Sequence, residues 1–333
     1  MDDKKTQSKD LPIQKHNPLM GSGKWRKRNV LTFFAFLFAA VVVSTILTGG
    51  YYFLGGENSR SETAMKVVRI GTQMTMPNVY INGTGVSSQF FFSADVKAHM
   101  QKVLGNEDKA VGELHGKMSF SSLWTTVDWV DGQYLSKLYF LHPHDLDRQP
   151  NYQETYAQTW EALDILPEGT VSELALSFDD LYSIDEVQSF LREFDIHIPW
   201  YAVHTGTEDE KGMYLTDKRI FGLFDHPTFD VSKNSSFRSS GETIGNEFKA
   251  GLQFLVENDR LAKKFLWSLD GTVNFDEMYQ YVEDNGVRTY GVVVTGPTKE
   301  LLKIMENEQI LYASLGEVTY WNWYNRPAYG VMY

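Results

Sequence analysis

The longest uncharged segment of the chain limits most strongly what it can fold into. Between Asn29 and Gly56 there is no charged residue, and Val30 to Leu54 is almost entirely apolar. As an α-helix with a rise of 1.5 Å per residue, this stretch is about 37 Å long, enough to cross the roughly 30 Å hydrocarbon core of a bilayer with some tilt. We therefore predict a single transmembrane helix over residues 30–54.

A cleaved signal peptide is the main alternative to an uncleaved membrane anchor. The apolar region of a signal peptide is usually about 7 to 15 residues long and ends at a small-x-small cleavage site. The stretch in this chain is longer and has no clear site of that kind. The uncleaved anchor is therefore the favoured interpretation, and either alternative exports the bulk of the chain.

Charge is distributed unevenly around this segment. Residues 1–29 contain eight Lys or Arg against three Asp, a net charge of +5, so the rest of the chain carries −17 and the whole chain −12. Because basic flanks stay on the cytoplasmic side, we expect the tail 1–29 in the cytoplasm and the acidic remainder outside the cell membrane. Trp25 at one edge of the segment and Tyr51 and Tyr52 at the other suit the two membrane interfaces.

The acidic bulk and the absence of cysteine exclude several classes of protein. Nucleic-acid binding needs a basic face to contact phosphates. Without cysteine there is no disulfide, no thiolate zinc site, no cysteine nucleophile and no anchor on a lipidated cysteine. No catalytic or cofactor-binding motif is recognisable either. The sequence therefore predicts a protein that is not an enzyme and has no cofactor.

The segment after the anchor divides into a linker and a β-rich region. Residues 55–65 are polar and contain glycine, which predicts a juxtamembrane linker. Residues 66–145 are expected to form a small β-rich domain next to the membrane. Asn82-Gly83 and Asp131-Gly132 predict tight hairpins there, because both pairs supply the positive φ values that such turns need.

We predict a second α+β domain over residues 151–325. A segment rich in proline and polar residues separates it from the first domain. Four strands are expected in two β-α-β units, at residues 171–178, 199–205, 288–295 and 310–323. A capping box at Ser183 and Glu186 predicts the start of the first helix. Two such units suggest the split, ferredoxin-like arrangement, with an antiparallel sheet and both helices on one face.

A long insertion, residues 206–287, separates the two β-α-β units. Its polar first part is typical of a mobile loop, and a second helix is expected over residues 261–269 after a first amphipathic one. The apolar face of that first helix consists of Ile244, Phe248, Leu252 and Leu255. Because long loops carry function more often than scaffolds do, we expect family-specific contacts in this insertion.

Three clusters have the residue types of a chemical or binding site. His142-Pro-His144-Asp145 has the composition of a metal site, but a further ligand cannot be placed and a solvated loop is the more frequent use of such a run. Asp179-Asp180 with Asp185-Glu186 suits a calcium site or an acid-base pair, yet helix capping explains the second pair without chemistry. The aromatic end, residues 320–324, is either a core strand or an exposed platform for a ligand or partner.

Three segments resemble a known family. They are VSELALSFDDLYSIDEVQSFL, WYAVHTG and GVVVTGPTKELLKI, which are similar to the C-terminal extracytoplasmic domain of the sigma-factor regulator family, membrane-anchored anti-sigma factors of Gram-positive bacteria. The resemblance covers residues 20–60 and 150–325. It implies a regulator that couples the state of the envelope to transcription and carries no catalytic residues.

The resemblance also implies the partners. An extracytoplasmic-function sigma factor is expected to bind directly or through a companion membrane protein, because residues 1–29 are shorter than an anti-sigma domain that wraps its sigma factor. The lipid bilayer is the other expected partner. The residues expected at partner surfaces are Trp25, Arg26, Lys27 and Arg28 beside the bilayer and Trp321 and Trp323 at the aromatic end.

Two other functions compete with regulation. The alternative from a different class is an anchored extracytoplasmic module that binds cell wall or a ligand and has no role in transcription. An exported hydrolase is the weakest hypothesis, because the plentiful serines have no recognisable catalytic partners.

Overall fold

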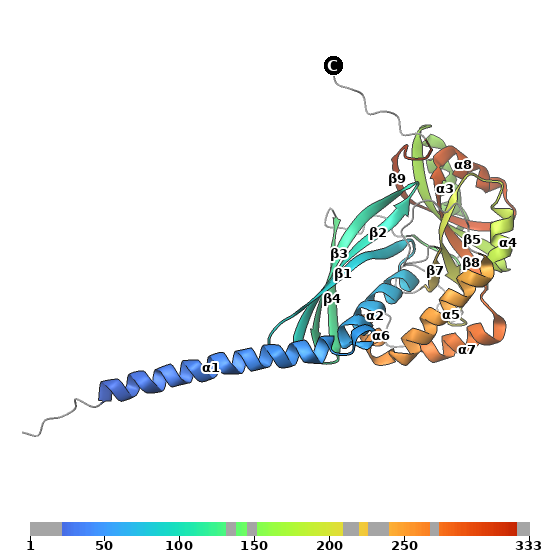
Figure 1. Cartoon of the computed structure of the whole chain (residues 1–333). Coiled ribbons are helices and arrows are strands. Elements are labelled where there is room, and N and C mark those ends of the chain that lie inside the picture. Colours follow the sequence, from blue (N-terminus) through green and yellow to red (C-terminus); the bar gives the residue numbers. More distant parts are fainter. Residues whose placement is uncertain are drawn as a thin grey trace, which may run out of the picture.

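The computed structural model consists of one long helix and a folded body built on two antiparallel sheets (Figure 1). The structure describes residues 22–130, 138–144, 152–208, 220–225, 240–266 and 273–324, with side chains from residue 28 onward. This combination of helices and antiparallel sheets confirms the predicted α+β class.

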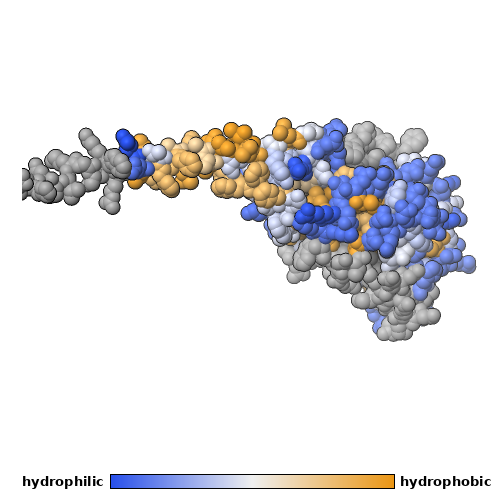
Figure 2. All heavy atoms as spheres, turned by 90° about the horizontal axis from the view of Figure 1, so that it is seen from below, coloured by the Kyte–Doolittle hydropathy of each residue, from blue (hydrophilic) through white to orange (hydrophobic). Residues whose placement is uncertain are grey.

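Helix α1, Ser22–Phe53, extends away from the body (Figure 1). Its segment Arg28–Phe53 is long and apolar enough to cross a membrane, and the rest of the protein buries none of its most apolar window. Phe36, for example, exposes 74% of its surface, which is unfavourable in water and favourable in lipid. Figure 2 shows the helix as a band of mainly apolar residues beside a largely hydrophilic body.

The stretch 55–65 is folded, contrary to the prediction of a linker. A 3-10 turn η1, Gly56–Asn58, follows α1 almost at once. Ser59 then caps helix α2, Arg60–Thr75, by accepting a hydrogen bond from the amide of Glu62 at 3.3 Å. The polar residues of this stretch form a turn and a helix cap. Turns, caps and linkers use the same types of residue, so composition does not distinguish them.

Four antiparallel strands in chain order form the first sheet. They are β1 Val79–Ser88, β2 Ser93–Leu104, β3 Glu107–Ser119 and β4 Ser122–Trp129. Residues 66–75 belong to α2, so the β-rich region predicted for 66–145 begins later than expected. Asn82-Gly83 lies inside β1 at a shift of register and forms an irregularity in the strand instead of the predicted hairpin. Asp131-Gly132 lies outside the described residues.

The second sheet has five antiparallel strands in the order β7-β6-β8-β5-β9. Its elements are β5 Thr170–Tyr182, α4 Ile184–Phe190, β6 His197–Val203, β7 Gly222–Phe224, β8 Thr289–Pro297, α8 Thr298–Lys303, the 3-10 turn η4 Ile304–Glu306 and β9 Ile310–Tyr320. One strand of each β-α-β unit lies between the two strands of the other unit, as predicted for the split arrangement. The predicted capping box of Ser183 and Glu186 is present.

Three helices pack together on one face of this second sheet. α4, α8 and the preceding helix α3, Tyr152–Ile165, share an apolar layer with Leu174 and its neighbours. On the opposite face Trp200 packs against Phe140. The Trp200 indole also donates a hydrogen bond to the carbonyl of Gln73 in α2, at 2.8 Å. This second face is therefore connected to α2, the helix that follows α1.

The insertion contributes three helices to the core: α5 Gly241–Glu257, α6 Asp259–Phe265 and α7 Phe275–Asn285. The four residues predicted to form the apolar face of α5 are all buried. The three helices share one apolar cluster with α2 and the inner face of the first sheet. In this cluster Phe265 lies so close to Gly71 that a Cβ added there would be 2.7 Å from its ring. The helical part of the insertion is therefore scaffold, and most of its polar first part (209–219 and 226–239) lies outside the described residues.

A buried ion pair joins the two sheets. Lys102 of β2 is only 4% exposed, and its Nζ lies 2.8 Å from carboxylate oxygens of both Glu173 in β5 and Glu317 in β9. The other oxygen of Glu173 accepts a hydrogen bond from the side-chain amide of Asn78 at 2.6 Å. The two predicted domains, 66–145 and 151–325, thus share buried polar contacts and form one folded body.

Lys102→Met is expected to lower the free energy of unfolding by about 3 to 5 kcal/mol, because it leaves the buried Glu173 carboxylate without its cation. Urea unfolding of the detergent-solubilised protein, followed by tryptophan fluorescence, measures this change. The double variant K102M/E173M removes both charges and is expected to recover part of the loss. A double variant less stable than the single one would contradict this account of the pair.

Candidate functional site

The last turns of α1 are where the membrane segment meets the body (Figure 1). Ser44, Thr48 and Tyr52 follow one another at four-residue spacing and so share one face of the helix. The Ser44 hydroxyl accepts a hydrogen bond from the amide of Phe91 at 3.1 Å. The Thr48 hydroxyl, which is fully buried, accepts one from the amide of Phe92 at 2.9 Å. The Tyr52 hydroxyl donates to the carbonyl of Phe92 at 2.7 Å. We call this face and the β1–β2 hairpin that it holds the junction.

Aromatic side chains pack around the junction. The ring of Phe92 lies 5.5 Å from that of Tyr51 and 5.3 Å from that of Phe120, between centroids. The guanidinium of Arg60 lies 4.1 Å from the centre of the Tyr51 ring, close enough for a cation–π contact. Phe91, Phe92 and Phe120 have φ values of 54°, 54° and 50°, in the left-handed region that bulky residues rarely adopt. The hydrogen bonds to α1 help to hold the hairpin in this unfavourable conformation.

The junction couples the position of α1 to the conformation of the first sheet. A movement of α1 along the hairpin breaks the hydrogen bonds that Ser44, Thr48 and Tyr52 make with the backbone of Phe91 and Phe92. A tilted, shifted or rotated position of the helix therefore differs from the present one in its hydrogen bonds to the hairpin. This property suits a relay of conformational change between the body and the membrane.

A second candidate site is a buried group of titratable side chains between the loop at residues 138–144 and the end of β6. Its members, His142, His204, Glu208 and Tyr290, are each no more than 3% exposed. His142 Nε2 lies 3.1 Å from His204 Nδ1, and that nitrogen lies 3.0 Å from a carboxylate oxygen of Glu208. The Tyr290 hydroxyl has no hydrogen-bond partner among the described residues, and burial raises its pKa well above the ordinary value.

The Glu208 carboxylate is well satisfied by hydrogen bonds. It accepts bonds from the amide and the hydroxyl of Thr205, at 3.0 and 2.6 Å, and from the amide of Thr207 at 3.1 Å. Burial by itself raises the pKa of Glu208, but the hydrogen bonds and charge of His204 and the bonds from Thr205 outweigh it and hold that pKa below its ordinary value. Glu208 is therefore a carboxylate at neutral pH.

The histidines that the sequence places in a solvated loop do not both lie in solvent. His142 is fully buried and pairs with His204, a residue far along the chain. Asp145 lies outside the described residues. Among the residues that are described, no group of three or more His, Asp or Glu is arranged to hold a metal ion. Sequence reasoning missed His204 and Glu208, whose only signal was a four-residue spacing at the end of a predicted strand.

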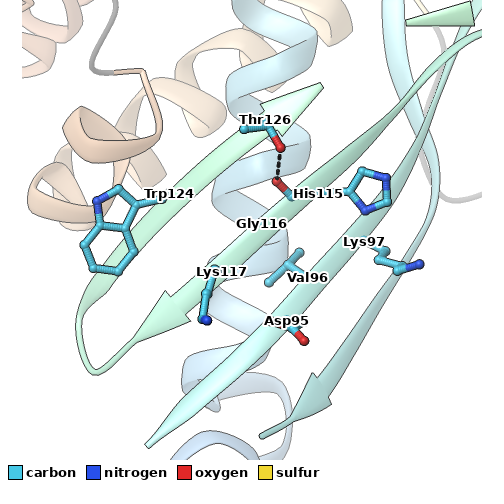
Figure 3. Close-up of a pocket in the computed structure, with 8 residues that line it drawn as sticks. All are labelled: Asp95, Val96, Lys97, His115, Gly116, Lys117, Trp124 and Thr126. Atoms are coloured by element: carbon cyan, nitrogen blue, oxygen red, sulfur yellow. Dashed lines mark hydrogen bonds between the residues drawn. The ribbon is translucent and has the colours of Figure 1, made fainter. Parts of the chain in front are cut away.

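A shallow cleft lies on the outer face of the first sheet (Figure 3). Its lining residues come from β2, β3 and β4: Asp95, Val96, Lys97, His115, Gly116, Lys117, Trp124 and Thr126. Lys117 lies directly between Asp95 and Trp124 in the register of the three strands. No sequence pattern marked this cleft, because its residues meet only when the three strands pair.

The residues expected at partner surfaces fall at both ends of the described chain. Trp25, Arg26 and Lys27 lie in the first turns of α1 with side chains outside the described residues, and Arg28 is exposed. Trp323 is only 4% exposed, and its indole donates a hydrogen bond to Asp195 at 3.0 Å. Trp323 is thus a packed residue at the end of the second sheet, while Trp321 is partly buried. A role of these residues in partner binding stays a prediction.

Comparisons with known proteins agree with this architecture. Residues 20–109 match the family described as sigma factor regulator N-terminal, and residues 163–317 match the one described as sigma factor regulator C-terminal. The chain therefore belongs to the sigma factor regulator family, and the similarity includes the first two strands of the first sheet, beyond the range that the sequence motifs indicated. A relative is the probable anti-sigma-M factor YhdL of Bacillus subtilis (strain 168), 30% identical over 322 residues that cover 94% of this chain and 86% of that protein. No solved structure matches the chain.

Glu208→Gln is expected to lower the free energy of unfolding by about 2 to 3 kcal/mol at neutral pH, since hydrogen bonds to a charged group are lost or weakened. The folded-state pKa of Glu208 lies below its unfolded value. The stabilisation is therefore complete above the unfolded value of about 4.3 and disappears as the pH falls through the lower, folded-state pKa. Urea unfolding of both proteins between pH 3 and 7 measures the difference. A difference that grows toward acid pH would contradict the assignment.

Thr48→Val is expected to lower the stability of the docked body by about 0.5 to 1.5 kcal/mol, because the side chain keeps its shape but the amide of the partly buried Phe92 loses its acceptor. Thermal unfolding in lipid nanodiscs measures the effect. Thr45→Val is the matched control, since the exposed Thr45 hydroxyl bonds only to the carbonyl of Val41 in its own helix. Equal effects of the two substitutions would show that the junction does not depend on this contact.

Proposed function

We propose that this protein is a membrane-anchored anti-sigma factor that couples the state of the cell envelope to transcription. The observation that carries the proposal is the similarity to a probable anti-sigma factor over nearly the whole chain, through the membrane helix and both sheets. A relative that shared only the folded body would support a binding module equally well. Similarity that also includes the anchor supports a function on both sides of the membrane.

In this proposal the N-terminus lies in the cytoplasm and the body lies outside. The support is the charge distribution, with a net +5 before α1 and −17 after it. An extracytoplasmic-function sigma factor is then bound by residues 1–29, directly or through a companion membrane protein. Such binding needs no catalysis, so the protein acts by holding or releasing its partner.

The relay runs through the junction. A change in the body reaches the β1–β2 hairpin, and the hydrogen bonds of Ser44 and Thr48 pass it to α1. The short, folded connection between α1 and α2 supports this step, since a flexible linker would absorb the movement. The N-terminal end of α1 then changes its tilt or rotation beside the cytoplasmic tail.

Co-purification from solubilised membranes tests the proposal. The full chain, tagged at its C-terminus, is expected to retain a sigma factor after crosslinking in intact cells, and a variant without residues 1–20 is expected to lose it. Binding of either variant to isolated cell wall is the control for the body. If the full chain retains neither a sigma factor nor a companion membrane protein, the regulatory function is wrong.

The alternative, an anchored wall- or ligand-binding module without a transcriptional role, is not favoured by membership of the sigma factor regulator family. The same experiment separates the two functions. A module of that kind would keep its cell-wall binding and show no sigma factor that depends on residues 1–20.

A further inference from the structure

The junction fixes the depth of the β1–β2 hairpin relative to the membrane. A hydrocarbon core of roughly 30 Å takes about 20 helical residues, so a core that begins at Val30 ends near Gly50. Ser44 then lies about 9 Å below that boundary. The amide of Phe91 is 3.1 Å from the Ser44 hydroxyl, so the tip of the hairpin lies at the depth of the acyl chains.

The tips at this end of the first sheet are apolar and exposed. Phe90, Phe91 and Phe120 expose 52%, 70% and 54% of their surfaces. The tip segments, 87–94 and 118–127, contain no charged residue. Exposed phenylalanines of this kind are unfavourable in water and are typical of a surface that enters another phase or a partner.

Four backbone groups at the tip of the hairpin have hydrogen-bond partners within the protein, which favours a place in lipid. The amides of Phe91 and Phe92 donate to α1, and the carbonyl of Phe92 accepts from both Tyr52 and the amide of Phe120. The carbonyl of Phe90 accepts a hydrogen bond from the hydroxyl of Ser93 at 2.7 Å. An ordinary loop in water has no need of so many internal partners.

The outer face of the same sheet is turned toward the membrane. In Figure 1, α2 and α6 lie on one side of the first sheet and α1 runs away on the other, so a bilayer crossed by α1 faces the uncovered side. That side carries Lys117 and the 61% exposed Trp124, which face each other in the neighbouring strands β3 and β4 (Figure 3). Tryptophan and lysine are the residues that suit the headgroup level of a membrane.

We propose that this end of the first sheet is immersed in the extracytoplasmic leaflet and binds phospholipid. Phe90, Phe91 and Phe120 lie among the acyl chains, and Lys117 and Trp124 lie at the level of the headgroup phosphates. The proposal rests on α1 crossing the membrane and is independent of sigma factor binding. Leaflet lipids thereby contact the same hairpin that holds α1, so a change in their packing acts on the junction itself.

Spin labelling tests this surface, and the absence of native cysteine makes each label unique. Nitroxides are placed through Phe90→Cys, Phe91→Cys or Phe120→Cys in the full chain, in nanodiscs of phosphatidylglycerol and phosphatidylethanolamine. Collisions with oxygen are expected to exceed collisions with a water-soluble nickel chelate, as in lipid. Ile165→Cys is the aqueous control, because Ile165 is 83% exposed at the end of α3.

Three results would overturn the proposal. Labels at the tips with the nickel accessibility of the Ile165 control would place the tips in water. Labels shielded from both reagents would place them against protein instead of lipid. A label through Leu37→Cys, in the middle of α1, that is not in lipid would show that α1 does not cross the membrane. This failure is distinct from a lack of sigma factor in the co-purification. Circular dichroism of each variant shows whether it keeps its fold. Equal accessibility of the labels at Phe90 and Phe91 shows that neither label has distorted its own surroundings.

Discussion

Hydrogen bonds between side chains of the membrane helix and the backbone of one hairpin tie α1 to the folded body. The hydroxyls of Ser44 and Thr48 are the acceptors, and the amides belong to the tip of the β1–β2 hairpin. Sliding α1 past the hairpin breaks these bonds, each of which contributes about 0.5 to 1.5 kcal/mol. These bonds, with that of the Tyr52 hydroxyl to the carbonyl of Phe92, hold the body in one orientation relative to α1.

In the described part of the structure, continuous packing connects α1 to both sheets. α2 begins at once after a three-residue turn, and its inner face belongs to the same apolar cluster as the first sheet and the insertion helices. Trp200 joins it to the second sheet through a hydrogen bond to Gln73. Close-packed interiors of this kind transmit strain. A ligand or partner at the second sheet is thus connected to the junction by continuous packing.

Two buried polar groups are distinctive features of this body. Lys102 and its carboxylate partners lie between the sheets, and the group of His142, His204 and Glu208 lies beside β6. Burying charges is unfavourable unless each one is paired and hydrogen-bonded, so such groups contribute to specificity of the fold more than to its net stability. Both groups bring together residues from distant parts of the chain. Each one therefore forms only when the sheets are assembled.

The sequence by itself determined the features that depend on local patterns. The uncharged run predicted the apolar segment of α1, Arg28–Phe53, to within two residues, and the capping box at Ser183 and the apolar face of α5 were predicted correctly. The order of strand and helix also indicated the split β-α-β arrangement, because the spacing of apolar residues differs between strands and helices. These signals are local in the sequence and do not depend on which helices and strands pack together.

Only the tertiary structure decided the rest. The polar residues at 55–65 have the composition of a linker, yet they cap and turn because α2 finds an apolar surface on the first sheet. Asn82-Gly83 forms an irregularity because β1 continues its pairing with β2 past it. The junction, the cleft and the buried histidine group each consist of residues that are far apart in sequence. Sequence spacing cannot reveal such contacts, since they are set by which surfaces exclude water together once the whole chain has folded.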